Sequence, residues 1–333
     1  VNTPPNKDIR WEKTTTVNVG VDFALFRHRL SGTIEYYNKY SVDLLAAING
    51  SPTQGFGYTT LMTNNGKMVN RGVEITLSGE IIRQKDFSWN ASLLYAFNRN
   101  KVKHISVQPS LWDSRISMPT SYPMVGKPLY GIYAYKWAGL NENGDPQVYD
   151  AENNVTSGPA RDYHALVYCG TTVPIHNASL TNVLRYKGFE FSAMLILDAG
   201  HKLRSSNIPS INMSNGRITS TAKGIVDRWT QPGDVTDVPR LLFSNDTENF
   251  NTHRTELYRY SDLFVYDASN IRLSNISLAY RVPAHWCKKI SLSGARLQFN
   301  VENVATFAFD SKANYDLGGK VKPNYVWGLY LNF

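Results

Sequence analysis

The chain has 333 residues, a net charge of +8, and many aromatic side chains, with 20 Tyr, 14 Phe and 7 Trp. Its Lys and Arg residues are scattered and no recognisable binding motif accompanies them, so the charge does not predict a nucleic-acid-binding protein. The spacing of Cys169 and Cys287 predicts no zinc site, and no apolar run reaches the roughly 18 residues of a transmembrane helix.

Apolar residues alternate with polar ones in stretch after stretch of the chain. This pattern predicts β-strands, because successive side chains of a strand point to opposite faces. In chain order, we expect strands at 14–26, 29–40, 73–81, 87–97, 175–186, 189–199, 269–281, 297–301 and 325–333. Helical periodicity is absent from long segments, so the predicted fold class is all-β.

The strand lengths and the connections favour a transmembrane barrel over a soluble sandwich. Ten residues at about 3.3 Å each, tilted near 45°, rise roughly 23 Å, which is close to the height of the apolar band of an outer-membrane barrel. Short links alternate with long segments at 42–69, 106–174, 201–268 and 308–324, which we expect to be external loops without regular structure. Short periplasmic turns and long external loops are typical of such barrels.

Charged residues on the strands indicate which face points to the lumen. Glu74, Glu80, Glu190 and Asp198 lie on the opposite face from apolar neighbours on the same strands. A charge near the midplane of the lipid face costs up to a few kcal/mol. We therefore expect these four side chains in the lumen, and the apolar residues between 73 and 77 and between 189 and 197 in lipid.

The last strand has one uniformly apolar face that ends on an aromatic residue, which resembles the assembly signal of bacterial outer-membrane proteins. The residues of this face are Tyr325, Trp327, Leu329, Leu331 and Phe333. The alternative is an ordinary core strand that ends the chain.

The number of predicted strands is odd, whereas bacterial single-chain barrels have an even number. The first strand would then run towards the periplasm, so the chain would start in an external loop, and its first residues do not form a signal peptide. We therefore expect residues 1–333 to be the C-terminal part, about nine strands, of a larger antiparallel transmembrane β-barrel with long extracellular loops, without the plug domain and the signal peptide.

Several short motifs, in the right order along nearly the whole chain, resemble the C-terminal barrel region of TonB-dependent outer-membrane transporters of the SusC/RagA type from Bacteroidetes. The matching stretches are Asp8-Ile-Arg-Trp-Glu-Lys-Thr14, Leu30-Ser-Gly-Thr-Ile-Glu-Tyr-Tyr37, Asn65-Gly-Lys-Met-Val-Asn-Arg-Gly-Val-Glu74, Val125-Gly-Lys-Pro-Leu-Tyr-Gly-Ile-Tyr133, Gly144-Asp-Pro146, Arg228-Trp-Thr-Gln-Pro-Gly-Asp234 and Ile271-Arg-Leu-Ser-Asn-Ile-Ser-Leu278. Two stretches, at 268–270 and 302–306, depart from the usual family pattern.

The resemblance implies TonB-dependent import of a large nutrient, an oligosaccharide or oligopeptide, across the bacterial outer membrane. It also implies a SusD-like surface lipoprotein as partner, and coupling to the TonB complex through an N-terminal plug that has no counterpart in these residues. Two other interpretations are a passive outer-membrane porin and a soluble all-β protein that binds or cleaves glycans.

No arrangement of residues predicts an enzyme, a metal site or a cofactor. The seven His residues form no close ligand pair, and no nucleophile accompanies Asp162 and His164. Aromatic residues of the long segments are candidates to stack on sugar rings, and packing of the loops or contact with a lid is the alternative. These candidates are Trp112, Tyr133, Tyr135, Trp137 and Trp229.

The predicted topology places Cys169 in an external loop and Cys287 in a periplasmic turn. The two ends lie roughly 25 Å apart, whereas a disulfide needs Cα atoms within about 7 Å. We therefore expect the two cysteines not to be bonded to each other.

Overall fold

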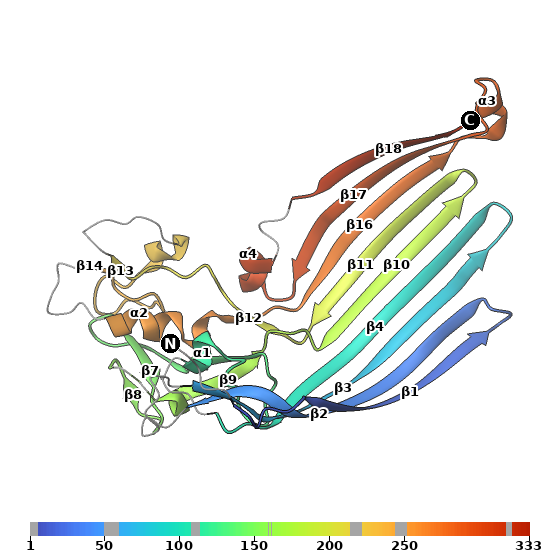
Figure 1. Ribbon diagram of the computed structural model, residues 1–333. Coiled ribbons are helices and arrows are strands. Elements are labelled where there is room, and N and C mark those ends of the chain that lie inside the picture. The colour runs from blue at the N-terminus through green and yellow to red at the C-terminus, as the bar shows by residue number, and fades with distance from the viewer. Residues whose placement is uncertain are drawn as a thin grey trace.

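A single antiparallel sheet of nine long strands is the main feature of the computed structural model, which describes residues 6–49, 60–107, 114–158, 160, 162–213, 222–243, 252–317 and 322–333. In spatial order the strands are β1 (Lys13–Leu25), β2 (Leu30–Asn49), β3 (Thr60–Arg83), β4 (Phe87–His104), β10 (His176–Tyr186), β11 (Phe189–Ala199), β16 (Asn270–Arg281), β17 (Gly294–Ala308) and β18 (Asn324–Asn332). The all-β prediction with nine strands is confirmed (Figure 1). β1 and β18 are the outer edges, so across the described residues the sheet does not close on itself.

The strands β2, β3 and β4 run well past their predicted ends. The expectation of a loop at 42–69 is wrong where the structure describes it, because β2 continues to Asn49 and pairs with β3 from Thr60. The pairing register shifts between Ser41 and Leu44, and Asp43 has a positive φ of 57°. Such a bulge interrupts the period-two pattern, which explains why the sequence did not reveal the extension.

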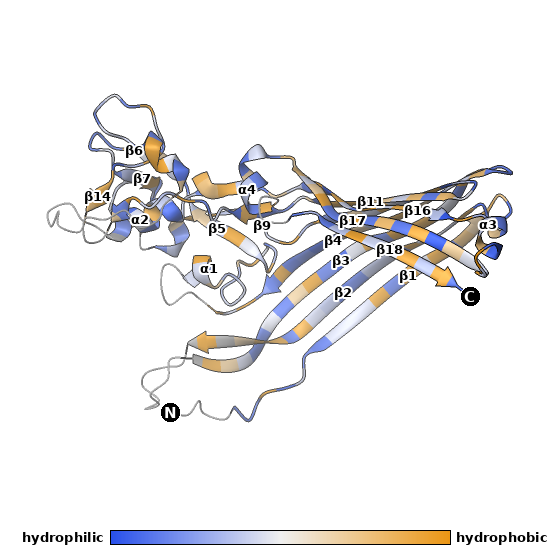
Figure 2. Cartoon of the chain, turned by 90° about the horizontal axis from the view of Figure 1, so that it is seen from above, coloured by the Kyte–Doolittle hydropathy of each residue, from blue (hydrophilic) through white to orange (hydrophobic). Residues whose placement is uncertain are grey.

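The sheet has one apolar and one polar face, and Figure 2 shows the alternation along the long strands. Ile34 lies opposite Ile75, and Ile75 lies opposite Tyr95, so apolar side chains continue from strand to strand. We call this the outer face. Successive residues of a strand point to opposite faces, and we call the face on which a residue lies its parity. Glu74 and Asp198 have the other parity, and we call their side the inner face.

Short links join the long strands at one end of the sheet. The β1–β2 turn has positive φ at Phe26, Arg27 and His28, and the β10–β11 turn consists of Lys187 and Gly188. The β16–β17 link holds α3 (Ala284–Lys288), which contains Cys287. Both cysteines are free thiols, and Cys169 lies on β9, beyond the opposite end of the strands (Figure 1).

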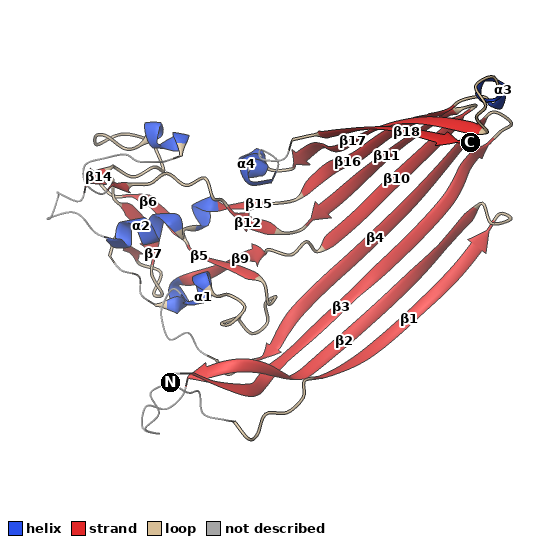
Figure 3. Cartoon of the chain, turned by 45° about the horizontal axis from the view of Figure 1, so that its top comes forward, coloured by secondary structure: helices blue, strands red, loops and turns tan. Residues whose placement is uncertain are grey.

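The long segments at that opposite end form short strands and helices of their own, which Figure 3 shows beyond the end of the sheet. The expectation of loops without regular structure is therefore wrong for the described residues. The strands there are β5 (Gly131–Tyr135), β6 (Trp137–Leu140), β7 (Pro146–Tyr149), β8 (Val155–Thr156), β9 (Leu166–Thr171), β12 (Lys202–Arg204), β13 (Asn212–Met213), β14 (Leu242–Phe243) and β15 (Val265–Asp267). The helices are α1 (Ser114–Ser117), α2 (Thr252–Arg259) and α4 (Asn314–Leu317), with 3-10 turns η2 (Tyr163–Ala165), η3 (Lys223–Asp227), η4 (Asp262–Phe264) and η5 (Ser311–Ala313).

We call the described parts of 114–174 and 200–268 the cap. Its elements pair over long distances in the sequence, as β12 does with β15. They bury two apolar clusters, one around Tyr133, Tyr135 and Leu257 and one around Ile211, Tyr258 and Phe264. Within the described ranges, no helix is long and apolar enough to cross a membrane.

Candidate functional site: the inner face and the cap

The inner face carries carboxylates that are held in ion pairs. Glu190 accepts hydrogen bonds from Arg185 at 2.7 Å and from Arg296 at 3.1 Å. Asp198 accepts from Asn177 at 2.8 Å and from Arg272 at 3.0 Å. Because these charges are paired across neighbouring strands, the inner face of β10, β11, β16 and β17 is polar but close to neutral.

The same face of β2 and β3 differs in charge. Glu35 and Glu74 lie directly opposite each other in the register of the two strands. Like charges in this position are destabilising, and neither carboxylate makes an ion pair within the described residues. This part of the inner face therefore favours contacts with hydrogen-bond donors or cations.

Two of the aromatic residues proposed to bind sugar lie inside the cap. Tyr133 and Tyr135 are each 1% exposed. The Tyr135 hydroxyl donates to the carbonyl oxygen of Ala160 at 3.0 Å, and the Tyr133 hydroxyl accepts from the backbone N–H of Met124 at 3.1 Å. Burial raises the pKa of Tyr133. Both side chains pack the core of the cap in this structure, and a direct role in binding stays a prediction.

Trp137 and Trp229 are only partly buried. The indole N–H of Trp137 donates to Asp237 at 2.9 Å, and its backbone N–H donates to Asp262 at 2.9 Å. The ring of Trp229 lies close to Gly144, where an added Cβ would lie 2.4 Å from the indole ring. These two rings keep some surface, so they remain candidates for contact with a ligand, while Trp112 lies outside the described residues.

An ion-pair network joins three separate segments of the cap. Asp145, in the turn between β6 and β7, binds Arg240 through two hydrogen bonds of 3.0 and 2.9 Å. It also accepts from Nε of Arg254, on α2, at 2.6 Å. The Arg254 side chain is 4% exposed and donates further to Asn212 and to the backbone of Arg240. Sequence reasoning noted Asp145 only as part of a motif, because its partners are about a hundred residues away.

A second arginine ties the cap together through backbone carbonyls. Arg204 donates to the oxygen of Tyr133 at 2.7 Å and to those of Arg259 and Ser261 at 3.2 Å. Next to it, Ser205 and Ser206 donate to Asp316, which lies on α4 between β17 and β18. These contacts join the cap to the segment between β17 and β18, so the cap is not a set of independent loops.

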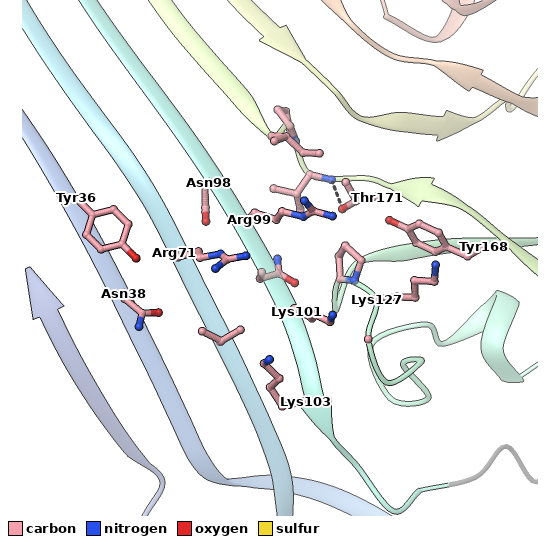
Figure 4. A pocket seen from close by; sticks show the side chains of 17 residues that line it. Tyr36, Asn38, Arg71, Asn98, Arg99, Lys101, Lys103, Lys127, Tyr168 and Thr171 are labelled. Carbon is pink, nitrogen blue, oxygen red and sulfur yellow. Dashed lines mark hydrogen bonds between the residues drawn. The ribbon is translucent and has the colours of Figure 1, made fainter.

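Two sizeable pockets lie where the strands meet the cap. One, of about 410 Å³, is largely apolar and includes Met68 and Val102, which have inner-face parity. The other, of about 500 Å³, is lined by Arg71, Arg99 and Lys101 among others (Figure 4).

The described residues offer no constellation for metal binding, since they contain no group of three or more His, Cys, Asp or Glu side chains that could hold an ion. Asp162 and His164, which are 2.7 Å apart, are both exposed. Asp162 caps η2 by accepting the backbone N–H of His164, and this bond lowers the pKa of Asp162. This pair has a structural explanation and adds no site.

Comparison with known proteins agrees with this architecture. A family model for the TonB dependent receptor-like β-barrel matches residues 1–304. TonB-dependent receptor P3 of Formosa agariphila is 25% identical over 97% of this chain and 33% of its own length, and TonB-dependent receptor SusC of Bacteroides thetaiotaomicron is 25% identical over 90% and 29%. A structure of the RagAB peptide transporter has the same fold, with a TM-score of 0.77, 22% identity, and coverage of 100% of this chain and 37% of that chain. The chain spans about a third of the length of the curated relatives it matches.

Proposed function

The chain belongs to the family of TonB-dependent receptor-like β-barrels, and on that premise we propose that it forms the C-terminal barrel wall and external cap of a nutrient importer of the outer membrane. The substrate would be an oligosaccharide or oligopeptide too large for ordinary porins. Energy would come from the TonB complex through a plug outside these residues, and a SusD-like lipoprotein would cover the external opening.

The observation that carries this proposal is the two-faced sheet with a folded cap at one end only. The outer face presents exposed apolar side chains such as Val19, Val21 and Leu329, which water would not favour but lipid would. The inner face is lined by paired charges and by the carboxylates of Glu35 and Glu74. A wall of this kind suits a polar lumen through which a hydrated substrate passes.

The chain would act by binding and enclosing the substrate, without bond chemistry. In this mechanism the lipoprotein delivers the substrate to the cap, the inner face holds it above the plug, and TonB displaces the plug. Partly exposed rings such as Trp137 and Trp229 would offer a stacking surface at the entrance.

A deletion of the whole gene tests the proposal in the native bacterium. Uptake of fluorescent oligosaccharide and oligopeptide pools should fall in the deletion strain, and equally after disruption of TonB, and complementation should restore it. Uptake of small solutes that does not depend on TonB would indicate a passive porin instead. Recovery of the complete protein in the soluble fraction without detergent would contradict the membrane assignment altogether.

A further inference from the structure

The larger pocket is strongly cationic. It has a volume of about 500 Å³ and lies where β2, β3 and β4 approach the cap. Five basic side chains line it: Arg71, Arg99, Lys101, Lys103 and Lys127. No carboxylate is among its described lining residues. Figure 4 shows these side chains around one space, together with Tyr36, Asn38 and Tyr168.

These five cations differ from three arginines of the inner face. Arg185, Arg272 and Arg296 on the inner face are all paired with carboxylates. By contrast, none of the five has a salt bridge within the part of the chain that the structure describes. The ammonium group of Lys127 lies over the ring of Tyr168, 4.9 Å from the ring centroid. Arg71 and Arg99 are directly opposite each other in the strand register, an arrangement that is unfavourable unless an anion lies between them.

The register places the pocket on the outer face. Arg71 pairs with Arg99, and the next pairs of the same parity are Val73 with Phe97 and Ile75 with Tyr95. The register of β3 and β4 does not shift between these pairs, since its irregularities lie at 67/68 and 80/82. Alternate residues of a strand share a face, so the cations continue the apolar face directly towards the cap.

The distance along the strand fixes the depth. Arg71 precedes Val73 by two residues, which corresponds to about 7 Å along β3 towards the cap. The end of the apolar band should coincide with the boundary of the hydrocarbon region. The cations then lie at the level of the lipid headgroups of the external leaflet, and a substrate inside the lumen would not meet them.

We propose that this pocket binds the phosphorylated headgroup of a glycolipid in the outer leaflet of the membrane. Arg71 and Arg99 would contact phosphate oxygens, which guanidinium groups recognise through two hydrogen bonds, and the three lysines would add point charges. Tyr36, Asn38 and Tyr168 would contact the sugar. The acyl chains would extend over Val73, Ile75 and Phe97. This inference rests on the proposed location of the barrel in the outer membrane.

The test uses the complete transporter, purified in detergent and stripped of lipid. It is incubated with bis-phosphorylated lipid A, and the retained lipid is measured by native mass spectrometry. The wild type should retain lipid A, and R99E/K101E should bind it roughly thirtyfold more weakly, because two attractive charges are reversed. Lipid A without its phosphates should bind the wild type as weakly as intact lipid A binds R99E/K101E.

The matched control is K85E/K288E, which makes the same change in net charge at the opposite end of the strands and should retain lipid A like the wild type. Heat-dependent mobility on gels verifies that each variant is folded. Equal retention by the wild type and R99E/K101E would overturn the proposal, as would tighter binding of a soluble sulfated oligosaccharide than of lipid A. Nutrient uptake is measured in a separate experiment, so a wrong substrate assignment would not change the retention of lipid A. Normal nutrient uptake, combined with equal retention of lipid A by the wild type and R99E/K101E, would reject only the lipid site.

Discussion

Replacing Asp145 with Asn should open the cap while the barrel stays folded. In the wild type this carboxylate accepts three hydrogen bonds from two guanidinium groups. The neutral amide would leave Arg240 and Arg254 close together without a counter-charge, and Arg254 is almost completely buried. Removing one partner of a buried ion pair costs roughly 3 to 5 kcal/mol.

The expected loss is smaller than that range because the site is not fully dry. The side chains of Asp145 and Arg240 are 17% and 24% exposed, and solvent screens part of the interaction, so we expect about 2 to 3 kcal/mol. The change acts on the local opening of the cap, whose elements contact the network, and not on the long strands. A free energy of this size raises amide exchange through local opening roughly 30- to 150-fold.

Hydrogen exchange of the complete protein, followed by mass spectrometry, measures this effect peptide by peptide. Exchange should rise in peptides that cover β6, β7 and α2, and should stay unchanged in β10 and β11. The control is Asp162→Asn, which alters an exposed carboxylate in the same cap and preserves its ability to accept the N–H of His164. If Asp145→Asn and Asp162→Asn give the same exchange in α2, the network does not hold the cap together.

Three further outcomes follow from the strands and from one thiol. Leu329→Arg places a cation on the outer face of β18 and should impair assembly of the barrel, at a cost of about 2 to 4 kcal/mol near the midplane. The control Val235→Arg, at a fully exposed position of the cap, should assemble normally. Equal amounts of the heat-modifiable gel band for the two variants would contradict this expectation. Gly72→Ala would bring a Cβ within 2.3 Å of a backbone oxygen and should destabilise the barrel by about 1 to 3 kcal/mol in thermal unfolding. In the control Gly294→Ala the nearest atom to the added Cβ lies at 3.6 Å, so the midpoint temperature of unfolding should stay unchanged. Burial raises the pKa of the Cys169 thiol from 9.0 to about 11, so that less thiolate exists at pH 8. Alkylation of Cys169, measured on its peptide, should therefore be about a hundredfold slower than that of an ordinary thiol. An alkylation rate that levels off near pH 9 would refute the raised pKa.

The sequence predicts the bounds of a long strand most accurately where one face of the strand would meet lipid and the other the lumen. β11 was expected at 189–199 and is found at Phe189–Ala199, and β10 differs from its expected range by one residue. In such a strand every second residue must be apolar, so the period-two signal is strong. Past the apolar band both faces meet water or protein. The alternation then fades, and together with the bulge near Asp43 this explains why the sequence does not predict the ends of β2, β3 and β4.

The cap was harder to predict for a different physical reason. Its strands are two to six residues long and pair with segments far away, as β12 does with β15 and β13 with β14. Stability there comes from contacts between distant residues, such as that of Asp145 with Arg254, and these leave no local periodicity. For the aromatic residues of the long segments the sequence left two interpretations open, stacking on a sugar or packing of the loops, and the hydrophobic effect places Tyr133 and Tyr135 in the cap core.

The cationic pocket shows how strand register adds information that composition lacks. In the sequence the basic residues are scattered, and Arg71 and Arg99 are separated by a whole hairpin. Pairing of β3 with β4 brings these two side chains to one level and one face, and the cap then adds Lys127 beside them. Alternation gives the same hairpin a second surface, because Glu74 points to the inner face only three residues from Arg71. Under the proposed function, one strand would contact lipid headgroups on one side and substrate on the other, and the face on which a residue lies would decide which of the two a substitution affects.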